Sequence, residues 1–244
     1  PHMRFVPLKS IEQQSVLALH RVRQGFVRAR TAQANQIRGL LGEVGLVIPR
    51  GIWRIASQIP AMLETASNDL PASFTALIER LTEHLKLLDR QVEEIHRHII
   101  AWGRSSSLSQ KLQKVPGIGP VTATALVATV GDARSFKNGR QMAAWLGLVP
   151  GQHSSGGKPK LLGISKRGDK YLRTLLIHGA RAVLLRVKLR QSRGEHSWLM
   201  GLLDRRHYNI AAVALANKNA RILWALMAHG KDFEPAFAAV RTHA

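Results

Sequence analysis

Two serines lie among glycines in one short segment, with a histidine before them and lysines after them. The segment from Gly147 to Lys158 has the sequence GLVPGQHSSGGK, and GISKRGD follows from Gly163 to Asp169. Glycine removes the Cβ atom that would hold a phosphate away from the backbone, and this composition is incompatible with a regular helix. We therefore expect an exposed loop that a phosphate backbone can approach closely.

The chemistry that such a loop could perform depends on activation of a hydroxyl group. A serine is a weak nucleophile unless a base removes its proton or cations stabilise the charge that develops in the reaction. His153 lies two residues before Ser155 and is the candidate assisting group, while Asp132 and Asp169 are the acids nearby. No Ser/His/Asp set is evident, so the residues alone leave a nucleophilic serine and an ordinary solvated loop as alternatives. The scarcity of carboxylates argues against a self-contained two-metal nuclease, and no metal-ligating residues are assigned.

The charge of the chain points to a polyanionic partner. There are 36 Lys and Arg against 15 Asp and Glu, a net charge of +21, and the stretch from Arg134 to Arg193 holds 14 basic residues and one acid, Asp169. Ordinary solvated charges would be more evenly balanced, so we expect nucleic acid, and DNA in particular, as the partner. The sequence has no cysteine, which excludes disulfides, zinc fingers and thiol catalysis. No long apolar run or signal peptide is evident, so we expect a cytoplasmic protein that does not bind membranes.

A second phosphate-binding signature precedes the serine segment. The sequence VPGIGP resembles a helix-hairpin-helix element, with Gly117, Ile118 and Gly119 in its turn. Such a turn directs backbone N–H groups outward at the start of the next helix, where the helix dipole also favours anions. An element of this kind binds the DNA backbone without reading base sequence. The alternative is a purely structural turn between two helices.

The elements that must position these residues are mainly α-helical. Ser10 and Gln13 resemble a capping box at the start of a long helix that reaches about Glu43, and a second long helix is expected from about Pro71 to Trp102. The second helix carries apolar residues at alternating spacings of three and four, as in a coiled-coil seam. An internal antiparallel helix pair and a dimerising coiled coil both fit these residues: Leu77, Leu81, Leu85, Leu88, Val92, Ile95 and Ile99.

The remaining pattern predicts short elements and a domain boundary. We expect a turn-rich break over 45–60, short helices over 108–114, 120–130 and 138–146, and longer helices over 165–190 and 208–229. The loop over 147–163 is expected to contain a Gly/Ser loop or a small β-hairpin with its turn at Gly156-Gly157. Residues 1–3 are interpreted as a cloning remnant, 4–103 as a coiled-coil assembly region, and 104–244 as a compact serine-bearing domain.

The order of the motifs resembles one family. VPGIG over 115–119, QMAAWLGLVP over 141–150, HSSGGK over 153–158 and GISKRGDKYLR over 163–173 follow one another. The series resembles the bacterial insertion-sequence transposases that pair a DEDD (RuvC-like) nuclease domain with a serine-bearing C-terminal domain. Some members of that family are bridge-RNA-guided recombinases. The resemblance covers nearly the whole chain.

The resemblance implies a mechanism and a set of partners. Ser155, five residues after Pro150, would attack a DNA phosphodiester and form a phosphoserine link, with Ser154 as the second candidate. The family's acidic, Mg²⁺-binding site lies in the nuclease domain, so no cofactor is expected in this chain, which alone would be inactive. The expected partners are DNA, a guide RNA and further copies of the chain, as a dimer or tetramer.

Basic residues near the motifs complete the expected interface. The contacts with phosphates are assigned to Lys158, Lys160, Lys166, Arg167, Lys170 and Arg173. Four arginines of the first long helix are candidates for binding guide RNA or DNA, or else only keep that helix soluble: Arg21, Arg23, Arg28 and Arg30. The alternative for the chain as a whole is a non-catalytic module for nucleic-acid binding and oligomerisation.

Overall fold

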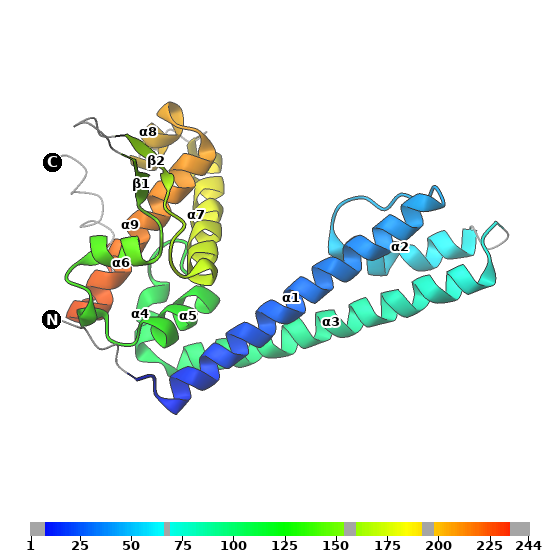
Figure 1. Cartoon of the computed structure of the whole chain (residues 1–244), viewed down its shortest axis with the longest axis horizontal. Helices are drawn as coiled ribbons and strands as arrows, with labels where there is room; N and C mark the ends of the chain where they lie inside the picture. The colour runs from blue at the N-terminus through cyan, green and yellow to red at the C-terminus, as the bar shows by residue number, and fades with distance from the viewer. Residues whose placement is uncertain (1–7, 66–68, 154–159, 192–197, 235–244) are drawn as a thin grey trace. The chain divides into compact units, whose positions relative to one another are not determined.

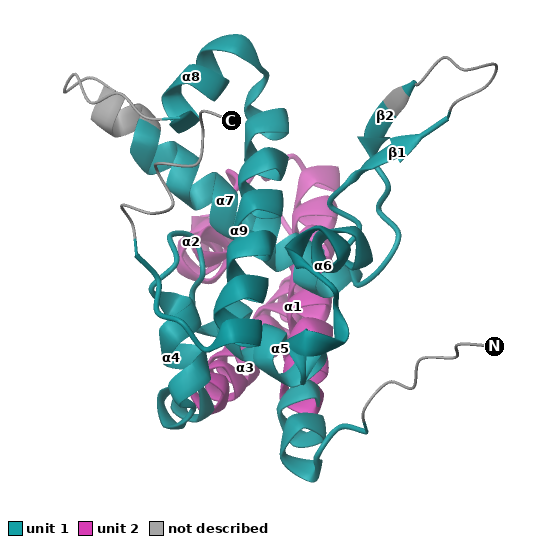
Figure 2. Cartoon of the chain, turned by 90° about the vertical axis from the view of Figure 1, so that its left-hand side faces the viewer, with its two compact units in different colours: residues 1–17, 100–244 teal, residues 18–99 magenta. Residues whose placement is uncertain are grey.

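The fold is mainly helical, as predicted, in the computed structural model, which describes residues 8–65, 69–153, 160–191 and 198–234 (Figure 1). The chain forms two compact units, one made by residues 18–99 and the other by residues 1–17 together with 100–244 (Figure 2). In the described ranges, no helix is long and apolar enough to cross a membrane.

The first long helix, α1 (Ile11–Glu43), begins at the predicted capping box. The Ser10 hydroxyl accepts a hydrogen bond from the Gln13 N–H at 3.1 Å, and the Gln13 side-chain oxygen accepts one from the Ser10 N–H at 3.0 Å. These two bonds satisfy N–H groups that have no partner within the helix. The capping box and the helix end at Glu43 are both confirmed.

The predicted break over 45–60 is wrong in its second half, where α2 (Ile52–Thr65) forms. Three apolar side chains at spacings of four, Ile55, Ile59 and Leu63, are buried on one face of this helix. Pro60 lies inside the helix and is exposed. A proline removes one helical hydrogen bond, and the burial of the apolar face outweighs that cost here.

The apolar seam of α3 (Ala72–Ser105) packs against helices of the same chain. Leu85 of α3 shares a hydrophobic core with Ile37 of α1 and Ile55 of α2, and each of these three side chains is fully buried. Polar contacts connect the same two long helices: Arg30 donates to Asp89 at 2.9 Å, and the Gln33 and His84 side chains are hydrogen-bonded at 2.8 Å. These contacts favour the internal helix pair as the explanation of the seam.

The other unit is a helical domain with one pair of strands among its described residues. Its helices are α4 (Ser107–Gln113), α5 (Pro120–Val130), α6 (Gly139–Trp145), α7 (Lys170–Gln191), α8 (Trp198–Arg205) and α9 (Tyr208–His229), with a 3₁₀ turn at Ala133–Ser135 and strands β1 (Pro150–Gln152) and β2 (Leu161–Ile164). Leu126, Met142, Leu176 and Leu223, from four different helices, are buried in one hydrophobic core. The helix α8 has no counterpart in the prediction.

The helix expected from residue 165 begins five residues later. Lys166 and Gly168 have φ angles of +54° and +113°, which a right-handed helix does not allow. The Asp169 carboxylate accepts a hydrogen bond from the Leu172 N–H at 2.9 Å and so caps the first turn of α7. The residues from 165 to 168 therefore form a turn between β2 and α7.

The buried seam leads to a first prediction. We expect Leu85→Ala to lower the free energy of unfolding by about 2–5 kcal/mol, because it leaves a cavity in a core made by three helices of one chain. Leu77→Ala, at a position 43% exposed, should change it by only about 0.5 kcal/mol. Thermal denaturation and light scattering check this. A variant Leu85→Ala that keeps its melting temperature but loses mass would instead assign the seam to a contact between copies.

Candidate nucleic-acid interface

The two strands hold the ends of the serine segment. Pro150 pairs with Ile164 and Gln152 with Leu161 in antiparallel register, and the His153 N–H donates to the Lys160 carbonyl at 3.0 Å. In Figure 2 the strand pair extends away from the helices of its unit. Ser154, Ser155 and Lys158, together with the turn expected at Gly156-Gly157, lie outside the described residues. His153, the last described residue before them, is exposed.

At the base of the strands, two stretches of backbone cross in close contact, residues 145–150 and residues 165–168. A Cβ atom on Gly168 would overlap the Trp145 carbonyl oxygen, and one on Gly147 would overlap that of Arg167. Both glycines also have positive φ angles, +113° and +71°. These positions therefore require glycine for two independent reasons, space and backbone conformation. We call this contact the backbone crossing.

Hydrogen bonds complete the backbone crossing. The Ser165 N–H donates to the Val149 carbonyl at 2.8 Å, and the Lys166 N–H donates to the Gly147 carbonyl at 3.2 Å. From α9, the Asn217 side chain donates to the Leu148 carbonyl at 3.1 Å. Hydrogen bonds to backbone groups thus attach the base of the strand pair to the helical core.

Arg173 belongs to this anchor. Its side chain lies in the first turn of α7, the residue is only 8% exposed, and Nη1 donates to the Leu146 carbonyl at 3.0 Å. A guanidinium group that is buried and hydrogen-bonded to a backbone carbonyl is not positioned to contact a nucleic-acid phosphate at the protein surface. We therefore assign Arg173 to the support of the backbone crossing, in place of the phosphate contact expected from the sequence.

The other cations of this region are exposed. Lys160 directly precedes β2, Lys166 and Arg167 lie in the turn after β2, and Lys170 is the first residue of α7. The acid among them, Asp169, uses its carboxylate to cap α7 at the Leu172 N–H. Four cationic side chains thus lie along the two ends of the strand pair, an arrangement that attracts phosphate groups.

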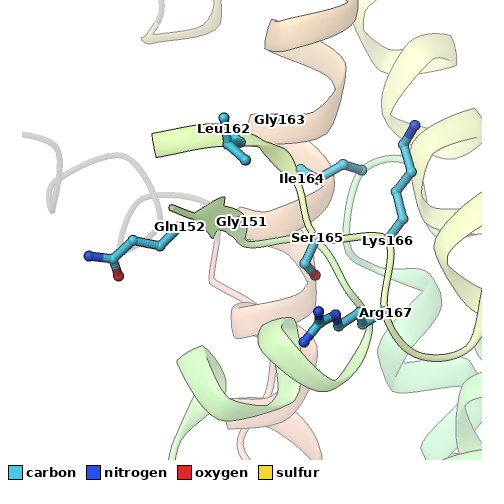
Figure 3. A pocket seen from close by; sticks show the side chains of 8 residues that line it. All are labelled: Gly151, Gln152, Leu162, Gly163, Ile164, Ser165, Lys166 and Arg167. Carbon is cyan, nitrogen blue, oxygen red and sulfur yellow. The ribbon is translucent and has the colours of Figure 1, made fainter. Parts of the chain in front are cut away.

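A pocket of about 410 Å³ lies between the strands and the turn that follows them (Figure 3). Figure 3 shows the Ser165 and Arg167 side chains extending to one side of the turn and the Lys166 side chain extending to the other. The described residues that line the pocket include no acidic one; they are Gly151, Gln152, Leu162, Gly163, Ile164, Ser165, Lys166 and Arg167. Sequence reasoning missed Ser165 and Gln152, because their position in a pocket depends on the pairing of β1 with β2.

The VPGIG turn joins α4 to α5 and packs into the domain. A Cβ atom on Gly117 would lie 2.8 Å from the Gly179 carbonyl oxygen of α7, and the Asn219 side chain donates to the Pro116 carbonyl at 2.9 Å. Ile118 is buried, whereas Gly119 is exposed at the N-cap of α5, which no side chain of the described residues caps. Of the three residues predicted to bind DNA here, Gly119 is the one that presents exposed backbone.

The four arginines of α1 that were predicted to bind nucleic acid divide into two pairs. Arg21 and Arg28 are exposed, whereas Arg23 and Arg30 are partly buried. Arg30 forms an ion pair with Asp89 at 2.9 Å, so its charge is already matched within the chain. The structure thus leaves Arg21 and Arg28 as the accessible members of the predicted set.

Comparison with known proteins gives a consistent result. Residues 109–196 match the family described as Transposase IS116/IS110/IS902 family. The chain is 51% identical over 236 residues to a probable family 20 transposase of Pseudomonas aeruginosa, covering 96% of this chain and 70% of that protein. This chain belongs to the IS116/IS110/IS902 family of transposases.

Two further transposases are similar to this chain over a comparable share of its length. The transposase for insertion sequence element IS1111A of Coxiella burnetii is 44% identical, over 95% of this chain and 63% of that protein. The transposase for IS1328 of Yersinia enterocolitica is 40% identical, over 96% of this chain and 69% of that protein. The chain thus spans about two thirds of the length of these transposases. The region matched by the family model contains the backbone crossing, both strands and the pocket.

The backbone crossing leads to a second prediction. We expect Gly168→Ala to lower the free energy of unfolding by about 2 kcal/mol or more, because its Cβ overlaps a carbonyl oxygen and its φ is positive. The control is Gly201→Ala in α8, where a Cβ meets no atom of the described residues within 4 Å and a gain of up to about 1 kcal/mol is expected. Chemical denaturation measures both. Equal stability of the two variants would contradict the close backbone contact at Gly168.

Proposed function

We propose that this chain binds DNA and takes part in breaking and rejoining DNA strands during transposition. Membership of the transposase family supports the reaction class. The observation that carries the proposal is the set of exposed cations at both ends of the strand pair, Lys160, Lys166, Arg167 and Lys170. Cations at these positions would hold a phosphate backbone beside the segment that contains the serines.

The proposed nucleophile is Ser155, with Ser154 as the second candidate. Its hydroxyl oxygen would attack a DNA phosphorus, forming a phosphoserine bond while the bond from phosphorus to one nucleotide oxygen breaks. The serine proton would pass to a base, for which the exposed His153 is the nearby candidate, and the departing oxygen would take up a proton. Lys166 and Arg167 would stabilise the additional negative charge on the reacting phosphate.

Metal chemistry would come from outside the described residues of this chain. Among them, no three His, Cys, Asp or Glu side chains lie close enough together to hold a metal ion. In this proposal, Mg²⁺ would be held by the nuclease domain that the family resemblance implies. This chain alone would then bind DNA without recombining it, and recombination would require assembly into a dimer or tetramer and, in RNA-guided members, a guide RNA.

The second candidate function is a binding module without chemistry of its own. It is favoured by the exposed start of α5 at Gly119, which no side chain of the described residues caps and which could hold a phosphate through backbone N–H groups. In that case the VPGIG turn and the cationic strand pair would grip the DNA backbone at two places. Strand transfer would be performed entirely by the nuclease domain.

The nucleophile is tested with the full-length transposase. We expect Ser155→Ala to abolish recombination and the covalent protein–DNA adduct while leaving DNA affinity nearly unchanged, because it removes one hydroxyl and no charge. Denaturing electrophoresis followed by peptide mass spectrometry detects the adduct, and Ser154→Ala is the matched control. Full recombination by Ser155→Ala together with loss in Ser154→Ala would move the nucleophile to Ser154. Full activity of both variants would favour the binding module.

The cations are tested by the salt dependence of DNA binding. Each lost phosphate contact should reduce the slope of log K against log salt by about 0.9, so we expect this change for Lys166→Ala and for Arg167→Ala. Arg173→Met should leave the slope unchanged and lower the melting temperature, because the buried guanidinium bonds to Leu146. If Arg173→Met instead reduced the slope and left the melting temperature unchanged, Arg173 would be assigned a phosphate contact, as the sequence predicted.

A further inference from the structure

One glycine in the strand pair has open space above it among the described residues. A Cβ atom on Gly163, within β2, would meet none of their atoms within 4 Å. Gly163 is also absent from the positive-φ positions of the described backbone, so a side chain would cause no strain there. Glycine within a strand marks either a bulge, and the register of β1 and β2 does shift between Pro150 and Gln152, or the close approach of a ligand or another backbone.

The neighbour of this glycine is an apolar side chain left in solvent. Leu162 is 52% exposed and lines the same pocket as Gly163 and Ile164. A strand backbone without a Cβ atom, next to an exposed leucine, offers a flat and apolar contact surface. The face of a nucleobase is planar and largely apolar, and the removal of apolar surface from water favours its contact with this surface.

The opposite end of the pocket is suited to a phosphate. Ser165 contributes a hydroxyl, and Arg167 contributes a guanidinium group that can bind a phosphate through two parallel hydrogen bonds. Lys166 has a φ of +54°, a conformation that costs energy for a residue other than glycine and that recurs at ligand-binding sites. This strained conformation lies in the turn that presents both Ser165 and Arg167.

We propose that this pocket binds a single unpaired nucleotide of the DNA strand, with its phosphate on Ser165 and Arg167 and its base over Gly163 and Leu162. The inference rests on the proposed function and adds the substrate class that the pocket takes. A volume of about 410 Å³ falls within the range of small-ligand pockets. A free phosphate would use the cations alone and would leave the exposed apolar end without a partner. A paired base has its faces covered by its stacked neighbours, so the nucleotide must be outside the duplex stack.

The test fills the space over Gly163 without changing any charge. We expect the 244-residue chain to bind fluorescently labelled single-stranded DNA, and Gly163→Ala and Gly163→Val to weaken binding progressively, by about tenfold or more for valine. Fluorescence anisotropy measures the affinities for single-stranded DNA, for RNA of the same sequence and for duplex DNA. The melting temperatures of both variants should equal or exceed that of the unaltered chain, because the added atoms meet open space among the described residues. Gly201→Ala, at another glycine whose Cβ would meet none of the described atoms within 4 Å, should leave binding unchanged.

The outcomes separate this inference from the proposed function. Unchanged binding by Gly163→Val, together with weaker binding by Lys166→Ala and Arg167→Ala, would overturn the nucleotide pocket and leave the proposed function standing. An effect of Gly163→Val on RNA alone would overturn the assignment to DNA. Failure of the unaltered chain to bind any of the three nucleic acids would overturn both the pocket and the proposed function.

Discussion

The close contact between two backbone segments beside Gly147 and Gly168 is the constraint on which the rest of the candidate site depends. Carbonyl oxygens lie where any side chain would place its Cβ atom, so the two segments can approach only without side chains at these points. The contact fixes where the chain leaves α6 for β1 and where it returns from β2 to α7. Arg173 reinforces it from α7, because its buried guanidinium donates to the Leu146 carbonyl beside the crossing.

Close backbone approach recurs in the helical domain. The VPGIG turn packs against α7 through Gly117 and Gly179, and α6 packs against α9 at Gly139, where a Cβ atom would lie 2.9 Å from the Arg221 Cα. Small buried residues such as Ala180 and Ala216 let the helices of the core come together in the same way. A tightly packed base of this kind can hold a strand pair in a defined position. The cations beside that pair remain exposed, because the anchoring among the described residues uses backbone groups and the side chains of Asn217 and Arg173.

The apolar pattern of the long-helix unit fits two different assemblies, and one of them forms within the chain. The seam of α3 has the spacing of a coiled coil, yet Leu85 of the seam is fully buried in a core shared with α1 and α2, and so is Ile78, whereas Leu77 of the predicted seam is 43% exposed. The ion pair of Arg30 with Asp89 and the hydrogen bond of Gln33 with His84 add polar contacts that align the two long helices. Apolar burial within the chain is sufficient to account for Leu85 of the seam without a contact between copies.

The sequence by itself determined the features that depend on neighbours along the chain: the helical class, the capping box at Ser10, the motif order and the excess of positive charge. It did not reveal α2, because its apolar face is stabilised by distant helices and local turn signals suggested a break. It could not distinguish Arg173 from Arg167, since burial depends on Leu146, which is 27 residues away in the chain. Nor did the sequence reveal that the described residues leave open space over Gly163. Local patterns fix local hydrogen bonds, whereas the tertiary structure alone decides which cations and glycines face solvent.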